Sequence, residues 1–89
     1  GIDTTHPALI RCPDKSKKVL AEYTFVSGGR TPSTTKEHGT AVAGIISGFQ
    51  TDGYRGMAPN SKLYSFNVFD EQGNADANDI VMAVHKAIE

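Results

Sequence analysis

The chain has one cysteine, almost no net charge and no long apolar run. The single cysteine, Cys12, excludes an internal disulfide and a zinc site built from several cysteines. Nine Lys and Arg residues against ten Asp and Glu residues give a formal net charge of −1, which offers no electrostatic attraction for nucleic acid or an acidic membrane. The longest apolar run, residues 41–46, is interrupted by a glycine and is far shorter than the ~20 residues of a membrane-spanning helix. Neither nucleic acid nor a membrane is therefore expected as a partner.

The length of 89 residues suits one domain with a marginal core. A chain this short buries only roughly 60 to 65% of its unfolded surface. It opens with Gly1-Ile2-Asp3, without an initiator methionine or a charged-then-apolar leader. We therefore expect a segment of a longer protein, whose localisation this sequence does not encode.

Apolar patterning predicts the order strand, helix, strand, helix. Residues 17–26 and 62–69 alternate with a period of two, and the first of these has apolar residues on both sides, typical of a strand buried on both faces. The residues after His38 form a large apolar side and a small-residue side, which predicts a helix buried on both sides. This order predicts an α/β fold, with a parallel sheet, right-handed crossovers and flanking helices.

A second helix is expected to begin at Asp76 or Asn78, whose side-chain oxygens can cap free backbone N–H groups. His85 lies at the edge of its apolar stripe and is expected to be an exposed helix residue. The stripe keeps helical spacing and consists of Ile80, Val81, Ala83, Val84, Ala87 and Ile88.

The candidate catalytic residue is His38, because small residues follow it at the expected helix start. An imidazole can accept and return a proton near neutral pH, but it needs a nucleophile at one ring nitrogen and a carboxylate at the other. The same pattern is equally compatible with a histidine that only packs. A peptidase pair of Cys12 and His38 is disfavoured because Cys12 lies in a proline-flanked loop, not at a helix start that favours a thiolate.

The segment His38–Gly44 resembles the histidine motif of the subtilisin-like serine proteases, the subtilases. Three further segments agree with that family in order and spacing. Gly1–Leu9 resembles the residues that directly follow the catalytic aspartate. Gly56–Tyr64 resembles the turn and strand after the histidine helix, and Val68–Asn74 resembles the strand end before the substrate-binding edge. The resemblance thus covers essentially the whole chain and implies a partial subtilisin-like domain over residues 1–89.

The resemblance implies that His38 is the general base, which takes the serine proton and returns it to the leaving amine. The triad aspartate would lie just upstream of Gly1, and the serine and the oxyanion-hole asparagine well after Glu89. Asp3 matches a different and variable acidic position of the motif, so it is not expected to replace the aspartate. His6 follows the motif and is expected to anchor a turn.

The residues Gly73, Asn74 and Ala75 match the edge that pairs, in the family, with an extended substrate through backbone hydrogen bonds. An ordinary turn explains Gly73-Asn74 equally well. The implied partners are a polypeptide substrate and the rest of the peptidase domain, with no cofactor. Calcium, which needs roughly six to eight oxygen ligands, is in doubt because Ala8 stands where the family often has an aspartate, and Asp52 alone is weak support.

The function implied by the resemblance is that of a secreted serine endopeptidase acting through an acyl-enzyme. Residues 1–89 by themselves are expected to be inactive, since they hold neither the serine nor the aspartate of the triad. The alternative is a catalytically dead subtilase-like peptide-binding module. A third reading, a globular α/β domain in which His38 only packs, is disfavoured by four motifs in register.

Overall fold

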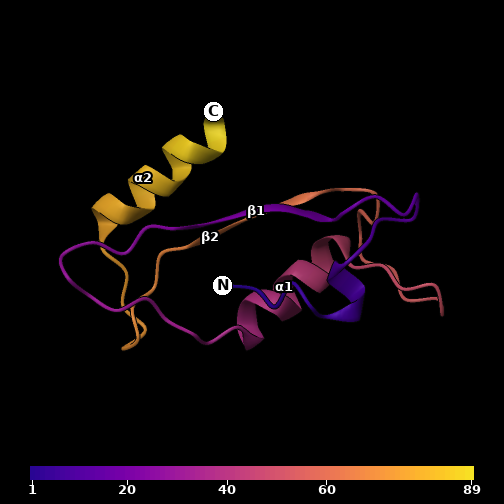
Figure 1. Ribbon diagram of the computed structural model, residues 1–89, viewed down its shortest axis with the longest axis horizontal. Coiled ribbons are helices and arrows are strands. Elements are labelled where there is room, and N and C mark those ends of the chain that lie inside the picture. The colour runs from indigo at the N-terminus through magenta and orange to yellow at the C-terminus, as the bar shows by residue number, and fades with distance from the viewer.

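Two strands run side by side through the middle of the molecule, with one helix on each side of them (Figure 1). The computed structural model describes all of residues 1–89. Its elements in chain order are η1 (Pro7–Leu9), β1 (Val19–Thr24), α1 (Glu37–Ser47), β2 (Leu63–Asn67) and α2 (Ala77–Ile88). The predicted order of strand, helix, strand, helix is confirmed, and so is a parallel sheet between flanking helices.

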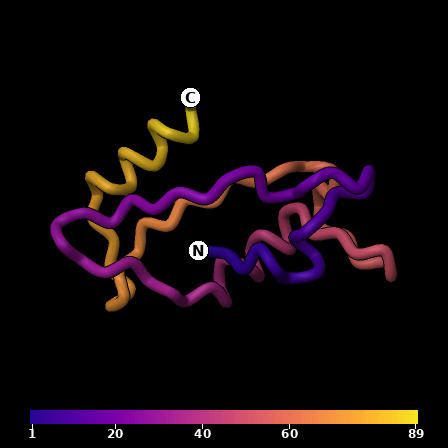
Figure 2. Tube along the Cα trace, in the orientation of Figure 1, coloured from indigo at the N-terminus to yellow at the C-terminus, as the bar shows by residue number.

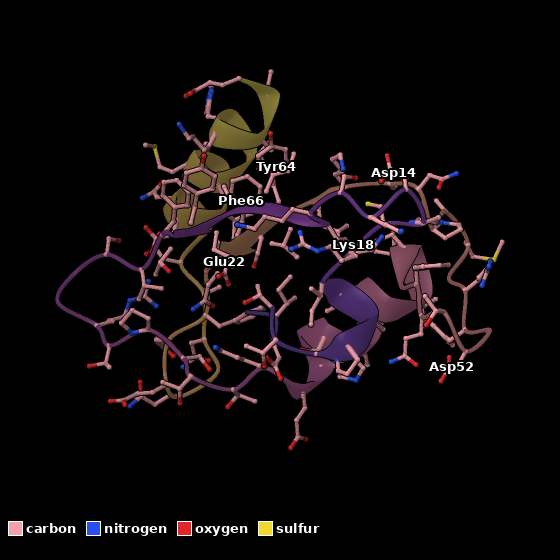
Figure 3. The ribbon with its side chains drawn as sticks, turned by 45° about the vertical axis from the view of Figure 1, so that its right-hand side comes forward. Asp14, Lys18, Glu22, Asp52, Tyr64 and Phe66 are labelled. Carbon is pink, nitrogen blue, oxygen red and sulfur yellow. The ribbon has the colours of Figure 1, made fainter.

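The strands β1 and β2 pair in parallel, with a register shift between Val19 and Ala21. Val19 pairs with Leu63 and both contact the core beside α1, whereas Tyr23 pairs with Phe66 three pairs further along. The Tyr23 and Phe66 rings stack at 5.4 Å, and Lys86 of α2 lies 5.1 Å from the Tyr23 ring. Figure 3 shows Phe66 on the α2 side of the sheet. The shift therefore turns the start of β1 towards α1 and its end towards α2, which the regular alternation did not predict.

The expectation that β1 is buried on both faces is wrong. Val19 is buried, but Leu20 is 43% exposed and the strand alternates between more and less covered residues. The physical reason is that nothing within residues 1–89 fully covers the side of the sheet on which Leu20 lies.

The expectation that α1 is buried on both sides is also wrong. Its small-residue side is covered, with Ala43 and Ser47 buried, but Ile45 on its large apolar side is 63% exposed. The helix α2 begins after Asp76, which accepts a hydrogen bond from the Asn78 N–H at 2.7 Å, as predicted. Its apolar stripe is nevertheless mostly exposed: Ala83 is buried, but Ile80, Val81, Val84 and Ile88 are not.

The core is small and lies between η1, the start of β1 and α1. It consists of Ile2, Leu9, Val19 and Ala43, with Leu63 packed against it. Only 13 of the 89 residues are buried, which confirms the marginal core expected for this length. Because these residues come from four segments, the core fixes the amino-terminal segment against α1 and β2.

Neither α1 nor α2 has the length and apolar character that a helix needs to cross a membrane.

Candidate active site

The amino-terminal segment passes directly over the first turn of α1 (Figure 2). The backbone of Gly1 approaches Gly39 so closely that a Cβ at residue 39 would overlap the Gly1 carbonyl oxygen. Two residues along, the Asp3 N–H donates to Thr40 Oγ1 at 2.8 Å. The small residues that follow His38 therefore make room for a neighbouring backbone, and they place Gly1 beside the histidine.

His38 is an exposed residue in the first turn of α1 and lines a groove of about 680 Å³. We call this the histidine groove. Gly1 and Gly73 line it too, so the structure brings two of the predicted site residues, His38 and Gly73, into one groove. Its walls are the first three turns of α1, the strand β2, part of the loop before α1, Phe69 and residues 71–73. The ring is thus not buried among apolar neighbours. Such burial would have excluded a role of His38 as a proton carrier.

The lining of the histidine groove mixes apolar side chains with glycines and polar groups. Val42 and Ile46 of α1 line it together with Phe69, and Ser33 and Thr35 supply hydroxyls before the start of α1. A concave, largely apolar surface with a few polar groups is typical of a ligand site. An extended peptide could lie along such a surface with one of its carbonyl groups near His38.

The residues predicted as the substrate edge form a tight turn. The Asp70 N–H donates to the Asn74 carbonyl at 2.8 Å, and the Gly73 N–H donates to the Asp70 carbonyl at 3.0 Å. Gly73 has φ of +82°, in the left-handed region that glycine tolerates best. Phe69 and Ala75 then form an isolated antiparallel bridge across the base of the turn. The turn interpretation of Gly73-Asn74 therefore describes the local geometry correctly.

Only one of these three residues keeps a free backbone N–H. The N–H groups of Gly73 and Asn74 donate to the carbonyl and the carboxylate of Asp70, whereas the N–H and carbonyl of Ala75 make no hydrogen bond within the chain. Asn74 and Ala75 do not line the histidine groove, although they directly follow Gly73, which does. The backbone that remains able to pair with another chain is thus that of Ala75.

Behind the turn lies an ion-pair network that the sequence analysis missed. Arg30 donates to Asp70 Oδ2 at 3.0 Å and to Asp79 Oδ2 at 2.7 Å, and both carboxylates are almost fully buried. The backbone N–H of Asn74, and also the Arg30 guanidinium, hold the pKa of Asp70 below its ordinary value. Hydrogen bonds from Ser27 and the charge of Arg30 do the same for the pKa of Asp79. An aspartate three residues before a glycine signals a turn, but no sequence signal links it to Arg30.

Asp3 does not line the histidine groove. Its carboxylate accepts hydrogen bonds from the Thr5 hydroxyl at 2.6 Å and the Thr5 N–H at 2.9 Å, which lower the pKa of Asp3. It lines a second cavity of about 590 Å³ with Thr40 and Gly44, on the face of α1 opposite to His38. This placement agrees with the expectation that Asp3 does not replace the aspartate.

The other two histidines have structural positions. His6 caps η1, where its Nδ1 accepts a hydrogen bond from the Ala8 N–H at 3.1 Å, so the expected role in a turn is confirmed. His85 lies exposed in the last turn of α2, as expected.

Cys12 is buried, and its sulfur faces two lysines rather than His38. Lys18 Nζ lies 3.8 Å from the sulfur and Lys62 Nζ lies 3.7 Å from it. Lys18 is itself fully buried and also donates to the Pro59 carbonyl at 2.9 Å. The Cys12 thiol is thus part of the packing at the start of β1, and it does not line the histidine groove.

The absence of the family's common calcium site stays a prediction, and two structural observations bear on it. Ala8 is buried in η1 and offers no side-chain oxygen, and no three His, Cys, Asp or Glu side chains gather in a way that could hold a metal ion. Asp52 lies in the loop after α1, apart from Asp14 and Glu22 (Figure 3).

Comparison with known proteins identifies the family of this chain. The family model described as "Subtilase family" matches residues 1–89. The chain is 35% identical over 86 residues to the "Thermophilic serine proteinase" of Bacillus sp. (strain AK1), covering 94% of this chain and 20% of that protein. It is 34% identical over 90 residues to "Subtilisin DY" of Bacillus licheniformis, covering 100% of this chain and 30% of the relative. It is 30% identical over 78 residues to the "Minor extracellular protease Epr" of Bacillus subtilis (strain 168), covering 85% of this chain and 12% of that protein.

No solved structure showed significant similarity to the chain. The chain spans between 12% and 30% of the length of these three relatives. Because the family model covers every residue, and several relatives exceed 30% identity along nearly all of the chain, this chain belongs to the subtilase family.

Proposed function

We propose that residues 1–89 are the histidine-bearing part of a serine endopeptidase, with His38 as the general base. The observation that carries this proposal is the position of His38: it is exposed and lines one groove together with Gly1 and Gly73. Gly1 lies next to the place expected for the triad aspartate, and Gly73 begins the expected substrate edge. A histidine that only packs would have no reason to lie open between these two segments.

In this mechanism a serine from outside residues 1–89 attacks the scissile carbonyl, and His38 accepts its proton. The imidazolium then donates that proton to the leaving amine, and the same ring activates the water that hydrolyses the acyl-enzyme. Three side chains and water complete this chemistry, so we propose no cofactor.

The aspartate that orients the imidazole would come from polypeptide before Gly1. A residue two positions upstream lies no more than roughly 7 Å along the chain from Gly1. Since Gly1 contacts Gly39, the residue after His38, such a carboxylate is within reach of the imidazole. The packing of Gly1 on Gly39 thereby supports an aspartate at that position.

The substrate is proposed to be an extended polypeptide that lies in the histidine groove and pairs with Ala75. The free N–H and carbonyl of Ala75 can add a substrate strand, whereas the N–H groups of Gly73 and Asn74 hold the turn together. In this proposal Gly73 and Asn74 shape the edge, and Ala75 binds the substrate backbone.

The partner that completes the protein is proposed to be the rest of its own peptidase domain. Ile45 of α1 and Val84 of α2 lie on exposed apolar faces, which a larger domain would cover. A location outside the cell is also proposed, because a relative of this chain is named as an extracellular protease.

Covalent labelling of the complete protein that carries residues 1–89 tests the function. A serine-directed phosphonate should label the folded wild-type protein and fail to label a His38→Ala variant, because the serine is not activated without its base. His85→Ala is the matched control, since this exposed histidine lies on α2 and does not line the groove, and it should label normally. Folded wild-type protein that resists labelling would instead indicate the catalytically dead peptide-binding module.

A further inference from the structure

We propose that Arg30 is a positioning residue for the peptide-binding edge, which it holds in place through Asp70. This inference rests on the proposed function, because it assumes that a polypeptide binds at Ala75. Arg30 touches no group that lines the histidine groove, so it acts from behind the turn.

The Arg30 guanidinium is held by three separate contacts. Its Nε donates to the Ser27 carbonyl at 3.0 Å, its Nη1 to Asp70 at 3.0 Å and its Nη2 to Asp79 at 2.7 Å. Asp79 also accepts from the Ser27 N–H at 3.0 Å. The planar guanidinium with its fixed donor directions thus joins the loop after β1, the turn after β2 and the first turn of α2.

Asp70 passes this restraint to the edge. One carboxylate oxygen accepts from Arg30, and the other accepts from the backbone N–H groups of Gln72 and Asn74 at 3.0 and 2.9 Å. The side chain of Asp70 is only 4% exposed. Removing the guanidinium would leave a buried carboxylate without its charge partner, and the side chain would have to turn towards water. Its bonds to the turn would then be lost or rearranged.

Backbone hydrogen bonds close to these side-chain contacts join two walls of the histidine groove. The loop after β1 runs through Ser33 into α1, and the Ser33 N–H donates to the Phe69 carbonyl at 2.9 Å. The Glu71 N–H donates to the Thr31 carbonyl at 2.9 Å. Arg30 lies at the start of this paired segment and fixes it with charge-assisted bonds, which are stronger than neutral ones. The distance between His38 and the edge is therefore set partly by Arg30.

The test compares an extended and a short substrate with the complete protein. An extended peptide amide reaches the edge, whereas a single-residue acyl ester does not. We expect Arg30→Ala to raise KM for the extended peptide roughly fivefold to tenfold, with kcat nearly unchanged and the ester unaffected. Arg55→Ala is the matched control, because Arg55 lies over the Phe49 ring at 4.7 Å, away from the groove, and should change neither substrate.

Two further variants keep the inference testable. Arg30→Lys keeps a charge that can reach one carboxylate, so it should recover part of the loss, and it carries the same comparison if Arg30→Ala does not fold. Asp79→Asn leaves the Arg30–Asp70 pair intact and should raise KM less than Arg30→Ala. Equal losses on both substrates, or no change in KM for the extended peptide, would overturn the role proposed for Arg30.

Failure of the proposed function is distinguishable from failure of this inference. If the wild-type protein resists phosphonate labelling and hydrolyses neither substrate, the affinity for the extended peptide is measured directly by titration calorimetry. Arg30→Ala should then raise Kd by a similar factor, and an unchanged Kd, or a wild-type protein that binds no peptide, would refute the positioning role.

Discussion

Gly39 packs directly on the backbone of Gly1, at a distance that leaves no room for a side chain on residue 39. The histidine helix and the amino-terminal segment are thereby locked together one residue after His38. In the proposed enzyme these are the two segments that carry the base and the carboxylate that orients it. The two segments can approach this closely because Gly39 has no Cβ.

Replacing Gly39 with alanine should separate these segments. The added Cβ would overlap the Gly1 carbonyl, so either the segment or α1 must move, at a cost of about 1 to 3 kcal/mol in the free energy of unfolding. We expect a loss of kcat of roughly a hundredfold in the complete protein, because a displacement of about 1 Å misplaces catalytic groups by a comparable amount.

Gly44→Ala provides the matched control in the same helix. The nearest atom to a Cβ at residue 44 is the Tyr54 hydroxyl at 3.9 Å, an ordinary contact. This variant should stabilise α1 by about 0.5 to 1 kcal/mol and leave kcat unchanged. Both variants are measured by thermal unfolding and by peptide hydrolysis. Equal changes in stability and in kcat for Gly39→Ala and Gly44→Ala would contradict the role given to the contact between Gly39 and Gly1.

Thr40 provides the second restraint on the amino-terminal segment. Thr40→Val keeps the shape of the side chain but removes the oxygen that accepts the Asp3 N–H, and should destabilise the protein by about 1 kcal/mol. Thr40→Ser keeps the oxygen and should retain most of the stability. Thermal unfolding of both variants, with kcat as a second readout, distinguishes the hydrogen bond from packing of the methyl group. An equally large effect of the serine variant would assign the role to the methyl group.

The order of elements and the caps could be predicted because their signals are local. Asp76 begins α2 through its own side chain, and the periodicity of β2 needs no knowledge of other segments. Burial could not be predicted in the same way. Ile45 lies on an apolar helix face, but whether that face is covered depends on segments that are distant in sequence or outside residues 1–89.

The histidine motif could locate His38, but the network behind the substrate edge could not be found from sequence. Arg30 is 40 residues from Asp70 and 49 from Asp79, and only the parallel pairing of β1 and β2 brings the following loops together. The register shift between Val19 and Ala21 could not be found from sequence either. A one-residue irregularity leaves the hydrophobic pattern unchanged but turns the strand, so it becomes visible only in the pairing.

The pair of buried aspartates predicts how stability depends on pH. The pKa values of Asp70 and Asp79 are lowered in the folded protein by hydrogen bonds from backbone N–H groups and by Arg30. A carboxyl with a lower pKa in the folded state stabilises it above the unfolded value, about 3.9, and this stabilisation is lost as the pH falls through the folded value.

We therefore expect the stabilising effect of these carboxylates to be constant near neutral pH and to disappear in acid. The measurement is the difference in melting temperature between wild type and the double variant Asp70→Asn with Asp79→Asn, followed from pH 7 to about pH 2. The difference should be largest at neutral pH and shrink below about pH 4, because the protonated aspartates then resemble the amides. A difference that grows in acid would contradict the lowered pKa values.

The small core predicts that single truncations inside it are severe. Leu9 is 1% exposed and joins η1 to Ile2, Val19 and Ala43, so Leu9→Ala should lower the free energy of unfolding by about 2 to 5 kcal/mol. Met57→Ala is the control, since Met57 is 88% exposed and should change stability by about 0.5 kcal/mol or less. Because the same core holds the amino-terminal segment against α1, Leu9→Ala should also reduce kcat at temperatures where the protein is still folded. A variant that loses stability but keeps full kcat would show that Gly39 and Thr40 alone suffice to hold that segment in place.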